Sequence, residues 1–537
     1  MSLPNSIIKV MSGVPLNNRY DHTLFFESIV KQEEYFNSKV EKTFNKFTYI
    51  RANRTIKIAG IVGNAQKWNY LMVNNPNDYI PWEYYFINKV EYINDDTVEL
   101  HIELDVIQTY CFIWRLKDCF IERSHTYTDE FGQYTIPEGL ETGPLINSGT
   151  TEFNLDDCCI LMSRSADTTG GAARSRVYGG VYSGIAVYAA NLTDYAKIGE
   201  WMDNASAGGY IDSIVSIWMY PKSLVSIVGT WSDGAIWHEV KDVNKQEYFN
   251  LTDRIGETID GYLVKNKKTL TYPYTMLYLS NNMGGSAVYR RELFDTSSGI
   301  YQFSVRGALS PEAGVMLTPG TKYKGTETNF EESLSLGGFP TCAWNSDTYK
   351  VWLAQNQHTM DHNIQQAKIQ MVAGFGAGAI AAASGNIAGT MGGIAAAYHG
   401  FSQIQGIMAQ KEDMEIQPPQ ARGNHSGNIN LTHGRMGFTA YLKTVTREYA
   451  IAIDNFFTMY GYKVNWLVPP TICNRSRFTY IKTVGCFVTG KIGSDDQVKI
   501  QSIFDKGITF WKDVNGVGDY YTPNDPLGAP IIPNPYN

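Results

Sequence analysis

The feature that most limits how this chain can fold is a long stretch without charge. Between Lys368 and Lys411 the sequence holds no Asp, Glu, Lys or Arg. The run reads IQMVAGFGAGAIAAASGNIAGTMGGIAAAYHGFSQIQGIMAQ (369–410), and nearly half of it is Gly or Ala. Water-soluble folds rarely contain such a run, and a bilayer crossing needs about 20 apolar residues. The run is therefore the first candidate for the part of the chain that carries its function.

Small residues recur at every fourth position of this run, and on a helix they would form one smooth stripe. Such a stripe lets helix backbones approach closely inside lipid, while the larger apolar residues lie off it. Gly385 and Asn386 divide the run into two short arms. The pattern predicts a helical hairpin that inserts when many copies associate. The residues predicted to be membrane-active are Met371, Ala373, Phe375, Ala377, Ile380, Ala381, Gly385, Ile387, Gly389, Met391, Gly393, Ile394, Ala397 and Phe401.

Two other interpretations of the run stay open from the residues alone. A Gly/Ala-rich helix pair could be buried in a core or in a subunit interface. The run could also be a flexible linker, although linkers usually lack this content of Ile, Met and Phe. Membrane contact is the interpretation that we carry forward.

The composition of the whole chain predicts a folded, β-rich protein of several structural units. Of its 537 residues, 43 % are hydrophobic, 18 % charged and 13 % aromatic. Disordered chains have fewer aromatic residues and more charge, and the Tyr, Phe and Gly content favours strands and turns. The net charge of −8 argues against a protein that grips DNA by neutralising phosphates. It is compatible with a channel that DNA passes through without sticking.

Cysteine usage and the first residues predict the compartment in which the chain is made. The seven cysteines are odd in number, sparse, and without zinc-binding spacing. We therefore expect mostly buried free thiols in a reducing cytoplasm. The first 23 residues hold no apolar stretch long enough for a signal peptide, so we expect no export by the usual route.

The order of patterns along the chain predicts four regions. Val98, Leu100, Ile102, Leu104 and Val106 alternate with polar residues, which is typical of a strand with one buried face. The expected fold class is mainly β (α+β), with several β domains forming a tube subunit and an inserted Gly/Ala-rich helical hydrophobic loop. We expect an N-terminal β tube domain (1–125), middle β domains (126–345), a helix with the membrane-active loop (346–430), and a returning β segment with an extended arm (431–537).

No enzyme motif is convincing, so we expect no catalytic residue, metal site or cofactor. HTMDH (358–362) places two histidines four residues apart, but it lacks the glutamate of zinc proteases and a clear third ligand. No P-loop is present in the sequence. The acidic pairs 95–96, 156–157 and 331–332 are typical of turns and solvated faces.

Several strings, in the same order along the chain, resemble one family of phage proteins. The strongest match is 82–125, which contains Asp105-x-x-Gln108-Thr109-Tyr110 and then Phe120-Ile121-Glu122-Arg123. The others are VPLNNRYDHTLFFES (14–28), GGVYSGIAVY (179–188), DNFFTMYGYKVNWL (454–467) and GITFWK (507–512). With the charge-free run at the expected place, they resemble the tail knob, or distal tail tube, proteins of phi29-like and related small short-tailed phages of Gram-positive bacteria.

The resemblance implies a structural subunit of the virion, and a function in genome ejection. It implies a homohexameric tube at the distal end of the tail, in contact with the proximal tail or collar protein and the tail-tip protein. In the family, hydrophobic loops plug the lumen and are then expelled to form a pore in the host cell membrane, a role that maps here onto 369–410. DNA would pass through the lumen without sequence-specific binding. The alternative is a receptor-binding or cell-wall-degrading tail protein in which the run is only buried packing.

Overall fold

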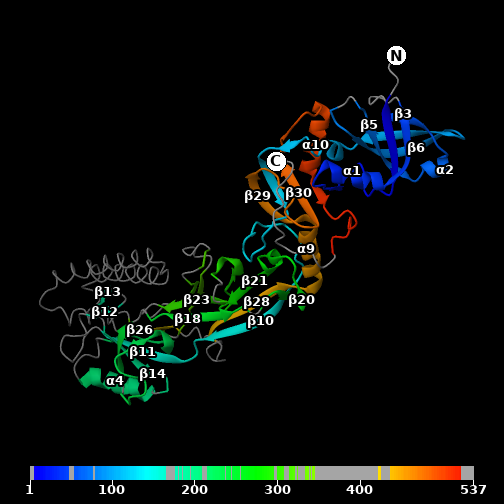
Figure 1. The fold of residues 1–537 in the computed structure, drawn as a ribbon. Coiled ribbons are helices and arrows are strands. Elements are labelled where there is room, and N and C mark those ends of the chain that lie inside the picture. Colours follow the sequence, from blue (N-terminus) through cyan, green and yellow to red (C-terminus); the bar gives the residue numbers. More distant parts are fainter. Residues whose placement is uncertain are drawn as a thin grey trace. The chain divides into compact units, whose positions relative to one another are not determined.

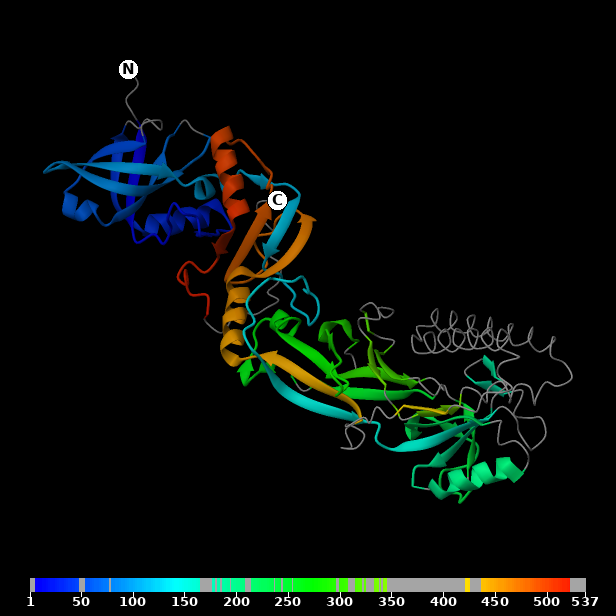
Figure 2. The same cartoon turned by 180° about the vertical axis from the view of Figure 1, so that it is seen from behind.

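The structure is a computed structural model with two compact units. Unit 1 comprises Met1–Gly143, Gly261–Leu270 and Arg447–Asn537, and unit 2 comprises Pro144–Asp260 and Thr271–Thr446. Figures 1 and 2 show the ribbon from opposite sides. The described residues are 5–47, 54–76, 79–164, 176–178, 181–183, 186–193, 195–207, 214–235, 237–242, 245–253, 255–295, 299–307, 314–320, 323–324, 333–337, 339, 341–344, 421–424 and 436–521.

Unit 1 begins with an antiparallel six-stranded sheet that curls around one apolar core. The strand order is β3-β1-β5-β6-β7-β4. Both edge strands contact the same apolar cluster: Ile56 and Ile58 of β4 belong to it, and the partly buried Phe44 of β3 packs against it. The bounds are β1 (Ser6–Ser12), β3 (Val40–Phe47), β4 (Thr55–Ala59), β5 (Trp68–Asn74), β6 (Glu83–Asn94) and β7 (Thr97–Leu104), with helices α1 (Ile29–Ser38) and α2 (Val62–Ala65).

Strand β7 confirms the alternation found in the sequence, but it ends earlier than predicted. Val98, Leu100 and Ile102 are buried, as expected for one face of a strand. Val106 does not continue the strand, because it begins helix α3 (Val106–Tyr110). The Asp105 side chain caps that helix by accepting the first free backbone amides, which ends the strand.

A second sheet of unit 1 has five strands, in the order β2-β32-β30-β9-β29. The pair β2–β32 is parallel and the other pairs are antiparallel. The sequence predicted strands after residue 431, and the structure adds the helices α9 (Arg447–Tyr460) and α10 (Ser494–Lys506). The strand bounds are β2 (His22–Leu24), β9 (Cys119–Ser124), β29 (Tyr462–Val468), β30 (Phe478–Val484) and β32 (Ile508–Trp511), beside the pair β8 (Arg115–Leu116) and β31 (Val488–Thr489).

Unit 2 contains two four-stranded antiparallel sheets and a seven-stranded sheet, so the mainly β fold class is confirmed. The four-stranded sheets have the orders β10-β28-β21-β22 and β18-β23-β24-β25. Their bounds are β10 (Leu145–Asn154), β18 (Glu247–Thr252), β21 (Thr275–Ser280), β22 (Ser286–Tyr289), β23 (Ile300–Gly307), β24 (Val315–Pro319), β25 (Leu334–Leu336) and β28 (Gly437–Val445). Unit 2 also holds the small hairpin of β12 (Arg176–Tyr178) with β13 (Val181–Ser183) and the short strand β19 (Thr258–Ile259), whereas β20 (Tyr262–Leu263) belongs to unit 1.

Six cysteines whose side chains the structure describes are free and buried, as the sequence predicted. They are Cys111, Cys119, Cys158, Cys159, Cys473 and Cys486. Burial raises the pKa of the Cys473 thiol to about 11, which keeps it protonated at neutral pH. These thiols therefore contribute to packing in the interior of the two units.

Candidate functional site: the stem of the charge-free insertion

The charge-free run belongs to an insertion that leaves and re-enters one edge of the seven-stranded sheet of unit 2. The strand order is β16-β17-β14-β11-β15-β26-β27. The insertion lies between β26 (Thr341–Trp344) and β27 (Ala421–Asn424), which pair antiparallel with Trp344 opposite Ala421. Paired antiparallel residues are about 5 Å apart between Cα atoms. The two ends of the insertion therefore meet at one point, and we call this strand pair the stem.

The residues that the sequence singled out in this insertion lie outside the described residues. This applies to all the predicted membrane-active residues, from Met371 to Phe401, and to HTMDH (358–362). Among the described residues, no helix combines the length and apolar character that a membrane crossing requires. The described part of the chain also contains no cluster of His, Cys, Asp and Glu able to hold a metal ion.

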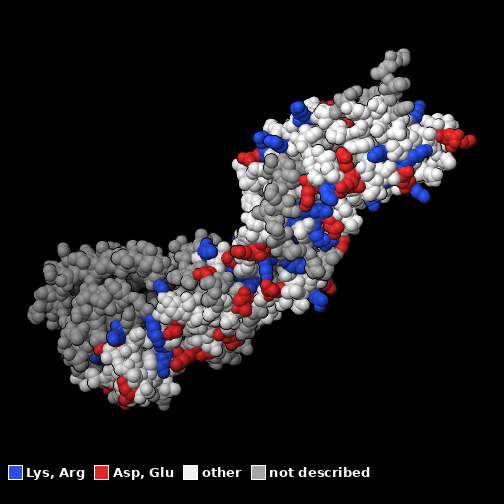
Figure 3. Space-filling view, viewed as in Figure 1, with Lys and Arg blue, Asp and Glu red and all other residues white. Residues whose placement is uncertain are grey.

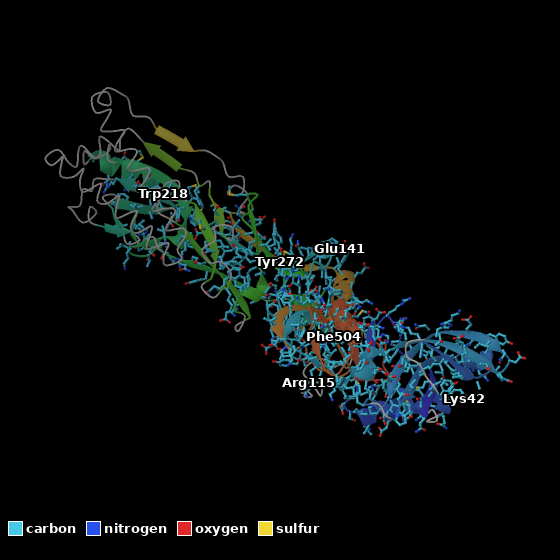
Figure 4. All side chains as sticks on the ribbon, turned by 90° about the horizontal axis from the view of Figure 1, so that it is seen from above. Lys42, Arg115, Glu141, Trp218, Tyr272 and Phe504 are labelled. Carbon is cyan, nitrogen blue, oxygen red and sulfur yellow. The ribbon has the colours of Figure 1, made fainter. Side chains whose placement is uncertain are left out.

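The sheet that carries the stem is closely packed. Strand β11 is buried along its whole length. The Arg164 guanidinium lies over the rings of Tyr188 and Trp201, at 4.9 and 5.6 Å from their centres. Trp218 of β15, labelled in Figure 4, pairs with Thr341 of the stem. The remaining bounds are β11 (Cys158–Arg164), β14 (Ala186–Asn191), β15 (Ile214–Pro221), β16 (Ser226–Ile227), β17 (His238–Asp242) and helix α4 (Tyr195–Ala207).

The strongest family-like string, around Asp105, forms a buried hydrogen-bonding hub in unit 1. The Gln108 side chain donates to the Thr23 hydroxyl and the Leu24 carbonyl, at 2.9 and 2.7 Å. Tyr110 donates to the Asp496 carboxylate of α10 at 2.7 Å. The hub joins α3 to β2 and α10. The residues of this family-like string therefore stabilise the fold of unit 1.

Asp105 itself is a buried carboxyl group in this hub. It accepts the amides of Ile107 and Gln108, both at 3.1 Å, and the Tyr70 hydroxyl at 2.9 Å. Burial raises the pKa of Asp105 to about 6, although these hydrogen bonds act in the opposite direction. The folded state therefore favours the protonated carboxyl group more than the unfolded state does.

The raised pKa of Asp105 predicts a measurable pH dependence. Between about pH 4 and pH 6 the folded state binds more protons at this site, so stability is lost as pH rises through this window. The full effect is about 3 kcal/mol for a shift of about two pKa units. In the variant Asp105→Asn, the asparagine still caps the helix but cannot titrate. We therefore expect the Tm of the variant minus the Tm of the wild type to increase from pH 4 to pH 6. A Tm difference that fell over this range would contradict the assignment.

A second buried network holds the segment Gly261–Leu270 within unit 1. Asp454 of α9 is fully buried, and both of its oxygens accept hydrogen bonds. Oδ2 accepts the Tyr262 hydroxyl at 2.7 Å and the Lys265 amide at 3.0 Å. Oδ1 accepts the Asn266 amide at 2.9 Å and its side-chain Nδ2 at 2.8 Å. One carboxylate thus fixes a segment that is distant from it in the sequence.

Glu138 is a third buried acid of unit 1, and it holds two cations. Arg123 of β9 contacts one carboxylate oxygen, and Lys268 contacts the other. The second oxygen also accepts the Lys463 amide at 2.9 Å. Sequence analysis singled out Arg123 but missed Glu138, because a glutamate in an irregular loop has no pattern that distinguishes it. It also missed Asp454, although this residue opens the family-like string 454–467.

The surface charges give no sign of a DNA-gripping face in the view that Figure 3 shows. On this face, Lys and Arg side chains are interspersed with Asp and Glu over the described residues. Exposed pairs of opposite charge include Lys89–Glu91 at 2.9 Å. Nucleic-acid binding through phosphates usually needs a continuous basic surface.

Comparison with known proteins identifies the family. The family described as Bacillus phage phi29, Tail knob protein gp9, C-terminal domain, matches residues 238–525, which is more than half of the chain. The chain belongs to this tail knob family. A second family, described as Caudoviral major tail protein N-terminus, matches residues 4–114.

Curated relatives match along almost the whole chain. The tail knob proteins gp9 of Bacillus phages PZA and B103 are each 24 % identical, over 97 % of this chain and 99 % of their own length. The gp9 of Bacillus phage phi29 is 23 % identical with the same coverage. The solved structure of the bacteriophage C1 tail knob protein, gp12, has a TM-score of 0.61 at 15 % identity. It covers 96 % of this chain and 98 % of that chain, which shows a shared fold.

These matches confirm the family that the sequence strings predicted. The chain is a structural protein of the phage tail, located in the virion, and it assembles with other tail proteins. The relatives are structural tail knob proteins, so the family gives the chain a structural and not an enzymatic role.

Proposed function

We propose that this tail knob protein forms a homohexameric channel at the distal end of the tail and opens the host cell membrane with its charge-free insertion. Before infection the segment 369–410 plugs the lumen, and during genome ejection it is expelled and forms a pore in the membrane. DNA then passes through the lumen without sequence-specific contacts. The protein is made in the host cytoplasm, and it contacts the proximal tail or collar protein and the tail-tip protein.

The absence of charge over 369–410 is the observation that carries the proposal. Ionised groups are costly in hydrocarbon, and a segment that moves from a lumen into lipid has to avoid them. Segments inside a bilayer also have to satisfy their own backbone hydrogen bonds, which favours helices. The ladder of small residues from Ala373 to Ala397 would allow several such helices to pack together.

The stem gives the insertion a suitable attachment. Because Trp344 and Ala421 are paired, the insertion can change its position without separating two distant parts of the sheet. In the sheet behind the stem, strand β11 is buried along its whole length, which favours a fixed base. A fixed base with a single point of departure suits a segment that acts by moving out of the tube.

Excision of the insertion tests the proposal. Residues 345–420 are replaced with Asn-Gly, because a two-residue turn of this type connects directly paired antiparallel strands. We expect the excised protein to keep its oligomeric state by native mass spectrometry. We also expect it to lose dye release from anionic liposomes by at least tenfold, measured before and after a mild acid or chaotrope pulse.

A matched pair of substitutions controls for altered folding of the insertion. Ile387→Lys places a charge in the run, and at the bilayer centre this costs about 2.5–3.5 kcal/mol. Ile387→Leu keeps the apolar volume and should leave dye release unchanged. Equal leakage from the excised and intact proteins would overturn the pore assignment. A wild-type protein that does not form hexamers would overturn the channel.

A further inference from the structure

An exposed apolar row crosses the outer face of the five-stranded sheet of unit 1. Phe120 of β9 lies opposite Leu467 of β29 on one side and Val484 of β30 on the other. Phe487 extends the row, since its carbonyl accepts the Lys117 amide just before β9. In this order, the four apolar side chains are 39 %, 74 %, 53 % and 54 % exposed. We call these four residues the apolar row.

Folding of unit 1 gives no reason for these positions to be apolar. The opposite face of the same strands supplies the buried residues Cys119, Ile121 and Ile481. Successive residues of a strand point to opposite faces, so the row faces away from this core. Contiguous exposed apolar residues usually mark a contact surface. The apolar row is therefore expected to be covered in the assembled tail.

A basic edge borders the apolar row at Phe487. Arg115, which Figure 4 labels, pairs with Thr489, and the Lys117 amide binds the Phe487 carbonyl. The Arg115 and Lys117 residues are exposed, and Asp118 is the exposed acid beside them. A second acid, Asp505, lies beside the edge, but its carboxylate already accepts the Thr483 hydroxyl and the Gly485 and Cys486 amides. The exposed side chains of Arg115 and Lys117 can therefore pair with acidic groups of a partner.

A surface of the complementary kind lies at the tip of the β6–β7 hairpin. Tyr92 and Ile93 are 58 % and 39 % exposed, and after Asn94 come the exposed acidic residues Asp95 and Asp96. The Asp95 carboxylate accepts the Tyr92 hydroxyl at 2.7 Å, and the Asn94 side chain accepts the Asp96 amide at 3.1 Å. These bonds give the tip a defined shape with apolar and acidic groups side by side.

The tip and the apolar row belong to the same unit but to opposite parts of it. Figures 1 and 2 both show the free end of β6 on the side of the six-stranded sheet that is farthest from β29 and β30. One copy therefore cannot bring its own tip onto its own row. When two different patches on one subunit bind each other, the contact is head-to-tail, and such contacts close into a ring when the rotation from copy to copy completes a circle.

We propose that the β6–β7 tip of one copy binds the apolar row and the basic edge of the next copy. Tyr92 and Ile93 cover the row, while Asp95 and Asp96 face Arg115 and Lys117. The inference rests on the proposed ring and names the surfaces that form it. The occupant of the row is thus a second copy of this chain.

Charge reversal tests this contact in the full-length protein. Asp95→Lys with Asp96→Lys, and separately Arg115→Glu with Lys117→Glu, should each weaken assembly at least tenfold, measured by sedimentation velocity over a concentration series. When all four substitutions are combined, attraction across the contact is restored with reversed sign, so we expect assembly to recover. Leu467→Asp should weaken assembly without lowering Tm, because this side chain is already mostly exposed.

A control variant and the leakage measurement distinguish failure of the tip–row contact from failure of the proposed channel. Swapping the exposed ion pair of α1, with Lys31→Glu and Glu34→Lys, should leave assembly unchanged. If both reversed proteins assemble like the wild type, or if the combination fails to recover, the tip does not bind the row and the inference is overturned. Either result leaves the channel and its leakage test intact, whereas a monomeric wild type would overturn the ring itself.

Discussion

Replacement of Glu138 with glutamine is expected to lower the free energy of unfolding of unit 1 by about 3–5 kcal/mol. The carboxylate is fully buried and contacts two cations, the nearly buried Lys268 and the mostly buried Arg123. Removal of one partner from a buried ion pair leaves the remaining charge without compensation, and this cost is of that size. Urea unfolding followed by tryptophan fluorescence would measure it.

Two further variants test whether the uncompensated cations cause the loss of stability in Glu138→Gln. In Glu138→Gln with Lys268→Met, one uncompensated charge is removed, so part of the lost stability should return. Glu130→Gln, at an exposed position of the same region, should change stability by less than about 0.5 kcal/mol. If the double substitution were less stable than Glu138→Gln alone, the buried charge would not be the cause.

The second large effect is expected at Asp454, where even an asparagine of the same shape should be poorly tolerated. Both carboxylate oxygens accept N–H or O–H groups, so the amide nitrogen of asparagine would face a donor in either orientation. Left without acceptors, the buried donors cost about 1–3 kcal/mol each. We expect Asp454→Asn to lower the free energy of unfolding by about 3 kcal/mol, measured by urea unfolding.

Limited proteolysis would show where the Asp454 substitution acts. The carboxylate fixes residues 262–266, so cleavage should increase within Gly261–Leu270 before the rest of unit 1 is attacked. Asp495→Asn is the matched control, because it changes an exposed acid in the first turn of α10 and should cost less than about 1 kcal/mol. Unchanged cleavage within this segment would contradict the role given to Asp454.

Local patterns predicted much of the β structure but missed several helices. The alternation from Val98 to Ile102 identified β7 because a half-buried strand requires it. Helix α9 was read as strand because it is rich in Tyr, Ile and Phe, which favour sheets. Its helical spacing is nevertheless visible in the buried residues Ala450, Ile453 and Phe457.

The segment proposed to carry the function stands out in the sequence by its missing charges, whereas its attachment could not be predicted. The run 369–410 stands out because the absence of Asp, Glu, Lys and Arg over this length can be read directly from the sequence. The pairing of Trp344 with Ala421 joins residues that are far apart in the sequence, and no local pattern marks it. The same holds for Glu138, whose two cations come from β9 and from a distant segment.

The stem also has a consequence for how this family can diversify. Closing a long segment at a single strand pair has an entropic cost that grows with the logarithm of its length, so doubling the length adds only about 0.6 kcal/mol. Selection can therefore lengthen or shorten the segment between Trp344 and Ala421 with almost no effect on the stability of the sheet. In the proposed pore, the reach of this segment into bilayers of different thickness can therefore evolve independently of the sheet that anchors it.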